Sequence, residues 1–499
     1  MSKFDFEYVP LTFINDNEEI IKQIKNTLIL IHLIERYKQP VRLETLIEGT
    51  QYGFNASALE AGKNKFLRIS DITENKVNWD TVPFCNCDDE ETYLLKNNDI
   101  LIARTGGTTG KSFKINYAPK HAIYAGYLIR IRAKKSVNPD YIDLFLHSYA
   151  YWSQIVNLNE GNFRPKANAE NLKALIIPNC NKAIQDDAVL LAKGEKIKGY
   201  EDLFIKIENT LAEYNRTKNI EDLLADQLAQ FNLLNQAILQ EAVQGKLVPQ
   251  HPEDEPASEL LKRFTAEKAK MGKKHKPLSA IKAEDIPFEI PESWVWCRLG
   301  EIAQIVRGGS PRPAGDKTYY DGDIPFLKVA DLTIGHDIYL NTYTYSIKEA
   351  GLYKTRYVEA NTLLLTNSGA TLGYPKICTF PTTFNDGIAA FLGLSDDLNK
   401  VYLFYFLKSL TKWFLKEASR GQGQPNLNTD IIGLTLFPLP PLLEQQRIVA
   451  EIERQLSKTS QLMEHVLDNR QANEQLMKAL LKDAFEEKVV EMEEVEYDK

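Results

Sequence analysis

Two turns of the chain carry polar side chains suited to reading the edges of DNA bases. Arg104-Thr105-Gly106 and Asn367-Ser368-Gly369 correspond to each other, because each follows a short apolar run and opens a glycine-rich turn. Arg and Lys pair best with guanine O6 and N7, whereas Asn and Gln pair best with adenine N6 and N7. Such substitutions between two copies of one turn predict a scaffold that reads two different base sequences.

A second pair of polar segments follows the same logic, near residue 165 in the first copy and near residue 425 in the second. Basic side chains there could contact phosphates, while amides could contact bases. For each single position, an ordinary polar surface loop remains an open alternative. The candidate DNA-binding residues are Arg104, Thr105, Gly107, Lys111, Lys114, Arg164, Lys166, Asn168, Gly309, Ser310, Arg312, Lys317, Asn367, Ser368, Arg420, Gln422, Gln424, Asn426 and Asn428.

The segment Gly106-Gly107-Thr108-Thr109-Gly110-Lys111-Ser112 is similar to the loop in which nucleotide-binding enzymes hold phosphates. However, Thr105 stands where the first glycine of that motif belongs. The second copy, from Gly369 to Gly373, continues with Tyr374-Pro375 and lacks the Lys and Ser/Thr of the motif. Because a nucleotide site would not need a twin without phosphate-binding residues, we interpret both segments as tight turns. An enzyme with a cryptic nucleotide site stays an alternative.

No other catalytic or metal-binding pattern stands out. The sequence contains no H-E-x-x-H, no G-x-S-x-G, no helix-opening G-x-G-x-x-G and no Asn-Pro-Pro-aromatic motif of an amino-methyltransferase. The five cysteines are scattered, and Cys85 and Cys87 have no second Cys/His pair at zinc spacing. The sequence therefore favours a binding protein that is not an enzyme, with no catalytic residue, cofactor or metal of its own.

The net charge of −8 does not by itself favour nucleic-acid binding. Residues 441–499 contain 8 Lys/Arg and 14 Asp/Glu, so much of the acidity lies in that segment, and DNA affinity would depend on a local basic face. No run of 18 or more uncharged apolar residues occurs, and the first residues lack a signal-peptide pattern. These features predict a cytoplasmic protein.

The same folding unit occurs twice in the chain. Phe66-Leu67-Arg68-Ile69-Ser70-Asp71 returns about 260 residues later as Phe326-Leu327-Lys328-Val329-Ala330-Asp331. Short apolar runs between Gly and Asn predict strands and turns in both copies, with a helix at residues 141–156 in the first. A long helix follows each copy, and residues 236–243 align with residues 478–485.

Each long helix has an apolar stripe at helical spacing. The second stripe is a heptad seam that Arg470 and Asn473 interrupt, and such polar positions can fix register and pairing partner. Two striped helices in one chain would pair antiparallel and act as a spacer of fixed length. The stripes comprise Ile220, Leu224, Leu228, Phe231, Leu234 and Ile238 in the first helix, and Val449, Ile452, Leu456, Thr459, Met463 and Val466 in the second.

The predicted fold class is mixed α/β, of the α+β kind. Two similar recognition domains are separated and joined by long, antiparallel, coiled-coil-like helices with pseudo-two-fold symmetry. A charged linker with a solvated, flexible character precedes the second domain. The expected divisions are an N-terminal helical segment (1–40), domain 1 (41–184), a central spacer helix (185–249), the linker (250–293), domain 2 (294–441) and a C-terminal spacer helix (442–499).

Several segments together resemble the DNA-specificity subunit of type I restriction–modification enzymes. One is the domain entry Ile290-Pro291-Glu292-Ser293-Trp294-Val295-Trp296-Cys297-Arg298-Leu299-Gly300, and another is Gly308-Gly309-Ser310-Pro311. A third is Pro438-Leu439-Pro440-Pro441-Leu442-Leu443-Glu444-Gln445-Gln446-Arg447-Ile448-Val449. The first copy departs from this pattern, because it has no equivalent of the Pro-Leu-Pro-Pro entry to its helix and no Gly-Gly-Ser-Pro.

The resemblance implies a subunit that reads a bipartite site in double-stranded DNA with two target-recognition domains. Its helices would set the spacing between half-sites and dock two methyltransferase subunits, and motor/restriction subunits would complete the complex. The partners would supply S-adenosylmethionine chemistry and the ATP- and Mg-dependent steps. An adaptor that presents two protein-binding modules is the remaining alternative.

Overall fold

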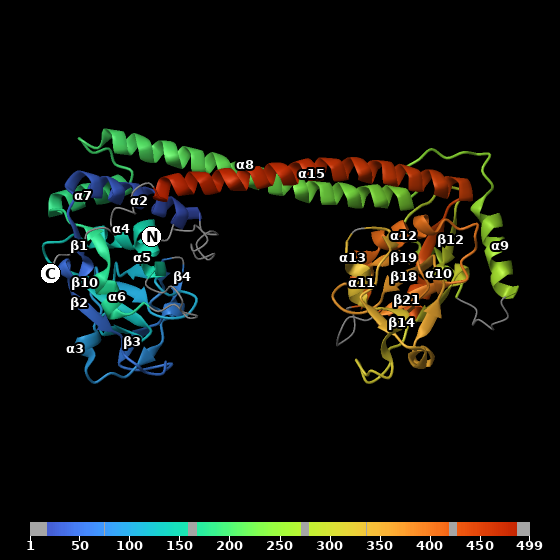
Figure 1. Cartoon of the computed structure of the whole chain (residues 1–499), viewed down its shortest axis with the longest axis horizontal. Helices are drawn as coiled ribbons and strands as arrows, with labels where there is room; N and C mark the ends of the chain where they lie inside the picture. The colour runs from blue at the N-terminus through green and yellow to red at the C-terminus, as the bar shows by residue number, and fades with distance from the viewer. Residues whose placement is uncertain are drawn as a thin grey trace. The chain divides into compact units, whose positions relative to one another are not determined.

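The protein forms two compact units, which a computed structural model describes (Figure 1). The first unit comprises Met1–Leu224 and Asn469–Lys499, and the second comprises Ala225–Asp468. Helices α8 (Glu201–Val243) and α15 (Leu442–Glu486) each contribute one part to each unit. The structure describes residues 17–73, 75–157, 167–270, 279–335, 337–418 and 427–486.

The first unit is built on a four-stranded antiparallel sheet of order β2–β10–β7–β8. Its central strand β7 is a continuous apolar run that is buried at every position, as expected for a strand covered on both faces. The sheet strands are β2 (Ile47–Tyr52), β7 (Ile100–Ala103), β8 (Ser112–Lys114) and β10 (Leu128–Ala133).

Besides α8 and α15, the described part of this unit contains smaller sheets and six helices. The other strands are β1 (Pro40–Arg42), β3 (Asn64–Leu67), β4 (Ile72–Thr73), β5 (Lys76–Val77), β6 (Phe84–Cys85), β9 (Ala122–Tyr124) and β11 (Ile176–Pro178). The helices are α2 (Asn17–Tyr37), α3 (Glu90–Tyr93), α4 (Pro139–Leu146), α5 (Tyr149–Asn157), α6 (Ala169–Ala174) and α7 (Lys182–Ala192).

The second unit has a five-stranded sheet of order β13–β21–β18–β19–β15 and a four-stranded sheet of order β16–β14–β20–β17. The strands are β12 (Val295–Arg298), β13 (Gln304–Arg307), β14 (Tyr320–Leu327), β15 (Tyr339–Leu340), β16 (Tyr345–Ile347), β17 (Arg356–Val358), β18 (Thr362–Thr366), β19 (Pro375–Cys378), β20 (Thr382–Phe384), β21 (Ile388–Leu392) and β22 (Leu436–Leu439). The helices are α9 (Ala257–Lys270), α10 (Leu299–Ile302), α11 (Val329–Thr333), α12 (Lys400–Ser409), α13 (Thr411–Ala418) and α14 (Thr429–Leu434).

The same hydrogen bonds recur inside each unit. The buried hydroxyl of Tyr141 donates to the carbonyl of Pro178 (2.8 Å), and that of Tyr402 donates to the carbonyl of Pro438 (3.0 Å). A glutamine side-chain oxygen accepts from the N–H of a helix-capping asparagine in each unit, at 2.8 and 2.9 Å. Parallel strand pairs β3–β9 and β14–β20 correspond as well. The predicted repetition of one mixed α/β fold is therefore confirmed.

Within the first unit, polar side chains join α8 to α15. Asn473 Nδ2 donates to the carbonyl of Thr217 (3.0 Å), and Arg470 Nε donates to Glu221 Oε1 (2.7 Å). The residue number falls along α8 as it rises along α15, so these helix segments are antiparallel. The two polar positions that interrupt the predicted seam thus have polar partners on α8.

Within the second unit, the remaining parts of α8 and α15 also pack together. Thr459 Oγ1 donates to Asn235 Oδ1 (2.7 Å), and apolar residues around Ile238 and Ile452 belong to one core cluster. Ile220 and Leu234 were expected in the α8 stripe, but both are exposed. At these two positions the next residues, Glu221 and Asn235, face α15 and have polar partners there, whereas the other four predicted residues of the stripe are buried or half-buried.

Two predicted helices and the linker differ from the structure. The expected helix at residues 141–156 is divided into α4 and α5, and the helix expected from residue 185 is divided into α7 and α8. The linker was expected to be a solvated tether, but residues 257–270 of it form α9. Ala257, Leu260 and Phe264 are buried in the core of the second unit, because their three- and four-residue spacing gives α9 an apolar face.

Tyr402→Phe is predicted to lower the free energy of unfolding by about 1 kcal/mol, because it removes the hydroxyl that donates to the buried Pro438 carbonyl. Chemical denaturation followed by fluorescence measures the change. Tyr357→Phe in the same unit is the control, since Tyr357 is half exposed. Equal midpoints for the two variants would contradict the structural role of this hydroxyl.

Candidate nucleic-acid interface

Arg104 is displayed at the end of β7 in the first unit. Its guanidinium lies over the ring of Tyr52, 4.8 Å from the ring centroid. Its backbone N–H donates to the carbonyl of Tyr127 (2.9 Å), whose side chain is 69% exposed. A stacked guanidinium keeps its donors directed outward while the tyrosine limits its rotation. The arrangement suits bidentate contact with guanine or with a phosphate.

The turn after Arg104 is a tight hairpin between β7 and β8. Gly106 and Gly110 have positive φ values of 88° and 86°, which favour glycine. The amides of Thr109, Gly110 and Lys111 donate to the carbonyls of residues 106, 103 and 108. In a phosphate-binding loop, backbone amides point at the phosphates and a helix follows, whereas here they are occupied and a strand follows. The interpretation as a tight turn is confirmed.

Lys111 and Lys114 belong to a different environment from Arg104. Lys114 forms an ion pair with Asp140, and its side chain is mostly buried. Lys111 lines a cavity together with Glu19 and His147. Thr105 is half-buried and Gly107 is exposed. Among the described candidates of this turn, Arg104 and Gly107 are therefore the ones open to a nucleic acid.

Asn168 and Asn428 have structural roles as helix caps. Their side-chain oxygens accept from the N–H groups of Asn171 and Ile431, each at 2.8 Å, and they start α6 and α14. These oxygens therefore serve the starts of the two helices, and contact of the two side chains with bases stays a prediction. Arg164, Lys166, Arg420, Gln422, Gln424 and Asn426 lie outside the described residues.

In each copy, the first described residue after the second polar segment contacts the turn. The N–H of Ala167 donates to the carbonyl of Arg104 (3.1 Å), and the N–H of Leu427 donates to the carbonyl of Asn367 (2.8 Å). The equivalence of Arg104 and Asn367 is thus visible in the backbone. Their side chains differ, because Asn367 is fully buried and its amide has no hydrogen-bond partner among the described residues. The predicted contact of Asn367 with DNA does not fit this burial, and its neighbour Ser368 is half-buried.

The loop after β13 contains the other candidates of the second unit. Ser310 Oγ donates to Asp386 Oδ1 (2.8 Å), so its hydroxyl is used within the protein. Gly309 lies so close to the backbone of residue 354 that a Cβ would meet its carbonyl oxygen at 2.4 Å. Arg312 and Lys317 are exposed, and they are the candidates of this loop that remain open to a nucleic acid.

Sequence reasoning missed an aromatic and basic group beside this loop, which we call the tyrosine–lysine patch (Tyr319, Tyr353 and Lys354). Lys354 Nζ lies 4.0 Å from the ring centroid of Tyr319 and donates to the carbonyl of Arg312 (3.0 Å). Tyr353 is 75% exposed. The hydrogen bond to Lys354 lowers the pKa of the Tyr319 hydroxyl. Aromatic faces with adjacent cations suit stacking and phosphate contact, and alternation of Tyr with Lys was the available signal.

The described parts of the chain show little else that could do chemistry. They contain no helix long and apolar enough to cross a membrane. They also contain no group of three or more His, Cys, Asp or Glu placed to hold a metal ion. All five cysteines are free thiols, and burial raises the pKa of the Cys85 thiol to about 11.

Comparison with known proteins identifies the class of domain. Residues 291–469 match the family model described as "Type I restriction modification DNA specificity domain". This part of the chain therefore matches the class of domain that the sequence motifs predicted.

Two relatives from Escherichia coli are similar to this chain. The specificity subunit of type I restriction enzyme EcoAI is 29% identical over 285 residues, which covers 55% of this chain and 48% of the relative. The specificity subunit of type I restriction enzyme EcoEI is 30% identical over 292 residues, with the same coverage of 55% and 48%. The chain spans about half the length of the curated relatives it matches.

A solved structure shares the fold over most of the chain. It is described as "Structural basis underlying complex assembly and conformational transition of the type I R-M system". The two chains are 19% identical and superpose with a TM-score of 0.54, covering 90% of this chain and 97% of the other. The likeness in fold is thus broader than the segment matched by the family model.

Gly110→Ala is predicted to destabilise the first unit by about 1–3 kcal/mol, because its φ is positive and a Cβ would meet the Trp152 ring at 2.8 Å. Gly107→Ala is the matched control, since its Cβ would meet nothing within 4 Å. Thermal unfolding should separate the two variants by several degrees. Equal unfolding temperatures would contradict the tight-turn geometry.

Proposed function

We propose that this chain is the DNA-specificity subunit of a type I restriction–modification complex and has no catalytic activity of its own. The match of residues 291–469 to a DNA specificity domain carries the proposal. The repetition of the same α/β architecture in the first unit extends it to a second recognition domain. Residues 41–184 and 294–441 would each read one half of a bipartite site in double-stranded DNA, and residues 185–249 and 442–499 would be spacer helices.

The exposed residues support different tasks in the two recognition domains. In the first, Arg104 stacked on Tyr52 would contact a guanine edge, and Gly107 would allow close approach of the backbone. In the second, Arg312, Lys317 and the tyrosine–lysine patch would contact phosphates and stack on sugar or base faces. Because the net charge is negative, affinity would depend on these local cations and fall as salt rises.

The outward faces of the long helices support docking of other subunits. Several large aliphatic side chains on α8 and α15 are exposed. They are not used in the pairing of the two helices, so they are available to contact another protein. Two methyltransferase subunits would bind there, and restriction/motor subunits would complete the complex. These side chains are Leu223, Leu233 and Leu234 on α8, and Leu443, Leu462, Leu467 and Leu476 on α15.

The chemistry in this proposal belongs to the partners. The methyltransferase subunits would bind S-adenosylmethionine and methylate adenine, and a motor subunit would use ATP and Mg. The complex would work in the cytoplasm, where it meets the DNA that it modifies.

Selection of bound duplexes from a random library tests the proposal directly. The chain would be purified with a methyltransferase subunit of this class, and the bound DNA would be sequenced at two salt concentrations. We expect two short specified segments and weaker binding at the higher salt. Binding without base preference, or partner binding that ignores both DNA and salt, would favour the adaptor alternative.

Arg104→Ala is predicted to weaken discrimination at one base pair of the first half-site by about 1–3 kcal/mol, or roughly 5- to 150-fold. Arg104→Lys should recover phosphate attraction but not bidentate base contact. Competition between duplexes that differ at single positions measures the effect. Arg42→Ala is the control in the same unit, because Arg42 is also exposed; a uniform loss at all positions would show that Arg104 contacts phosphate only.

Leu462→Lys is predicted to weaken copurification of the methyltransferase subunit about tenfold, because it places a charge within a desolvated contact. Gln461→Lys is the matched control on the neighbouring exposed position. Titration of the partner against each purified variant gives the dissociation constants. If both variants bind the partner as the wild type does, this face of α15 is not a docking surface.

A further inference from the structure

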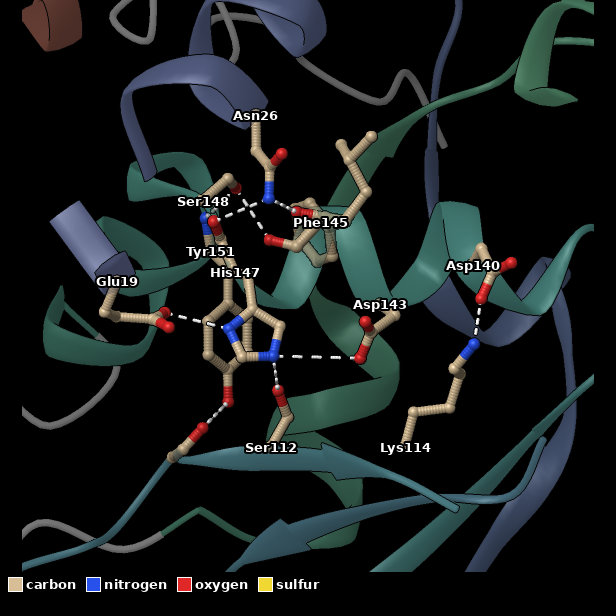
Figure 2. Close-up of polar contacts among 12 residues, drawn as sticks. Glu19, Asn26, Ser112, Lys114, Asp140, Asp143, Phe145, His147, Ser148 and Tyr151 are labelled. Atoms are coloured by element: carbon tan, nitrogen blue, oxygen red, sulfur yellow. Dashed lines mark hydrogen bonds and ion pairs between the residues drawn. The ribbon is translucent and has the colours of Figure 1, made fainter. Parts of the chain in front are cut away.

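A polar cluster lies beneath the recognition turn of the first unit, and Figure 2 shows its side chains. His147 lies just after α4, and each of its two ring nitrogens faces a carboxylate. Its Nδ1 lies 2.8 Å from Glu19 Oε1, and its Nε2 lies 3.7 Å from Asp143 Oδ1. The same Nε2 lies 3.4 Å from the hydroxyl of Ser112. The imidazole therefore connects α2, α4 and β8.

The cluster belongs to a continuous set of contacts around the connection between α4 and α5. Asn26 of α2 donates through Nδ2 to the carbonyls of Leu144 (3.1 Å) and His147 (2.9 Å). Thr27 Oγ1 accepts from the N–H of Tyr149 (2.9 Å). Helix α2 is thus tied to this connection by side chains on two consecutive positions as well as by Glu19.

The opposite side of the cluster reaches the turn that carries Arg104. Ser112 is the first residue of β8, directly after the turn. The hydroxyl of Tyr151 donates to the carbonyl of Gly110 (2.7 Å), which Figure 2 also shows. A cavity of about 190 Å³ is lined by Glu19, Thr108, Lys111, Ser112, His147 and Trp152. Because the described residues leave this space under the turn partly unfilled, the polar contacts there help to hold the turn.

The charges around His147 favour its protonated form. Burial lowers the pKa of His147, but the hydrogen bond to Glu19 and the charges of Asp143 and Glu19 together raise it above the ordinary value. Burial raises the pKa of Glu19, yet His147, Lys22 and Lys111 bring it below the ordinary value. Lys114 and Asp140 lie further along the same cluster as an ion pair. A protonated imidazole has no lone pair, so Ser112 and His147 do not form a nucleophile and its general base.

The second unit provides an internal comparison, because its scaffold forms without this cluster. When Asn138 and Tyr141 are aligned with Asn399 and Tyr402, Lys408 stands in the place of His147. By the same alignment, Phe404 replaces Asp143. Alignment on the turn glycines 110 and 373 places Pro375 at the position of Ser112. The common fold therefore does not require these polar residues, which suggests a task specific to the first unit.

We propose that His147 is a positioning residue, whose charged contacts with Glu19 and Ser112 hold the recognition turn of the first unit in its base-reading geometry. The inference rests on the proposed function of this turn. Discrimination at the first half-site should then depend on pH, while discrimination at the second should not. The carboxylates of Glu19 and Asp143 attract the protonated imidazole more strongly than the neutral one. This added stabilisation is present below the ordinary histidine pKa and is lost as pH rises through the raised pKa of His147.

Competition binding of the complete chain with its methyltransferase partner, from about pH 6 to about pH 8, tests this inference. Duplexes with single base changes in one half-site at a time separate the two units. We expect discrimination at the first half-site to fall about tenfold with rising pH. Discrimination at the second half-site should stay constant. His147→Gln should give weak discrimination at the first half-site at every pH, and Glu19→Gln should shift the profile to lower pH. Lys408→Gln, at the equivalent position, should leave the first half-site unaffected.

Amide hydrogen exchange separates a failure of this inference from a failure of the proposed function. The N–H groups of Gly110 and Gly373 make equivalent hydrogen bonds of 2.8 Å. The ratio of their exchange rates therefore cancels the direct effect of pH on the exchange chemistry. We expect Gly110 to exchange faster relative to Gly373 as pH rises, and in His147→Gln at every pH. A ratio that changes neither with pH nor in His147→Gln would overturn the positioning role, whether or not the chain binds DNA.

Discussion

Each unit depends on one backbone constraint, the attachment of a hairpin turn to the segment that leads into a short helix. The carbonyls of Arg104 and Asn367 accept from the N–H groups of Ala167 and Leu427, and asparagine caps then start the helices. Backbone groups and caps make these contacts, so the side chains of residues 104 and 367 can differ. A shared backbone with different side chains is what the proposed reading of two sequences would need.

The features that are local in sequence could be predicted. Glycine spacing predicted the tight turns, because Gly106 and Gly110 need positive φ, and heptad spacing predicted the seam of α15. The caps at Asn168 and Asn428 could also have been predicted, since an asparagine before a short helix is a common start signal. They were instead interpreted as base contacts, because polar character alone does not distinguish the two roles.

Features that depend on contacts distant in sequence could not be predicted. The burial of Asn367 and the ion pair between Lys114 and Asp140 follow from packing between elements that the sequence does not place. In the seam of α8, Glu221 and Asn235 take the places predicted for Ile220 and Leu234, because they have polar partners on α15. The tyrosine–lysine patch likewise needed the folded loop to bring Tyr319 and Lys354 together.

The central claim is that two recognition units of one fold read two separate half-sites. Genome-wide mapping of adenine methylation in cells that express this chain with its methyltransferase partner tests it most directly. The account predicts methylation within two short specified sequences separated by an unspecified stretch of constant length. Methylation at one continuous sequence, or with no sequence preference, would contradict it.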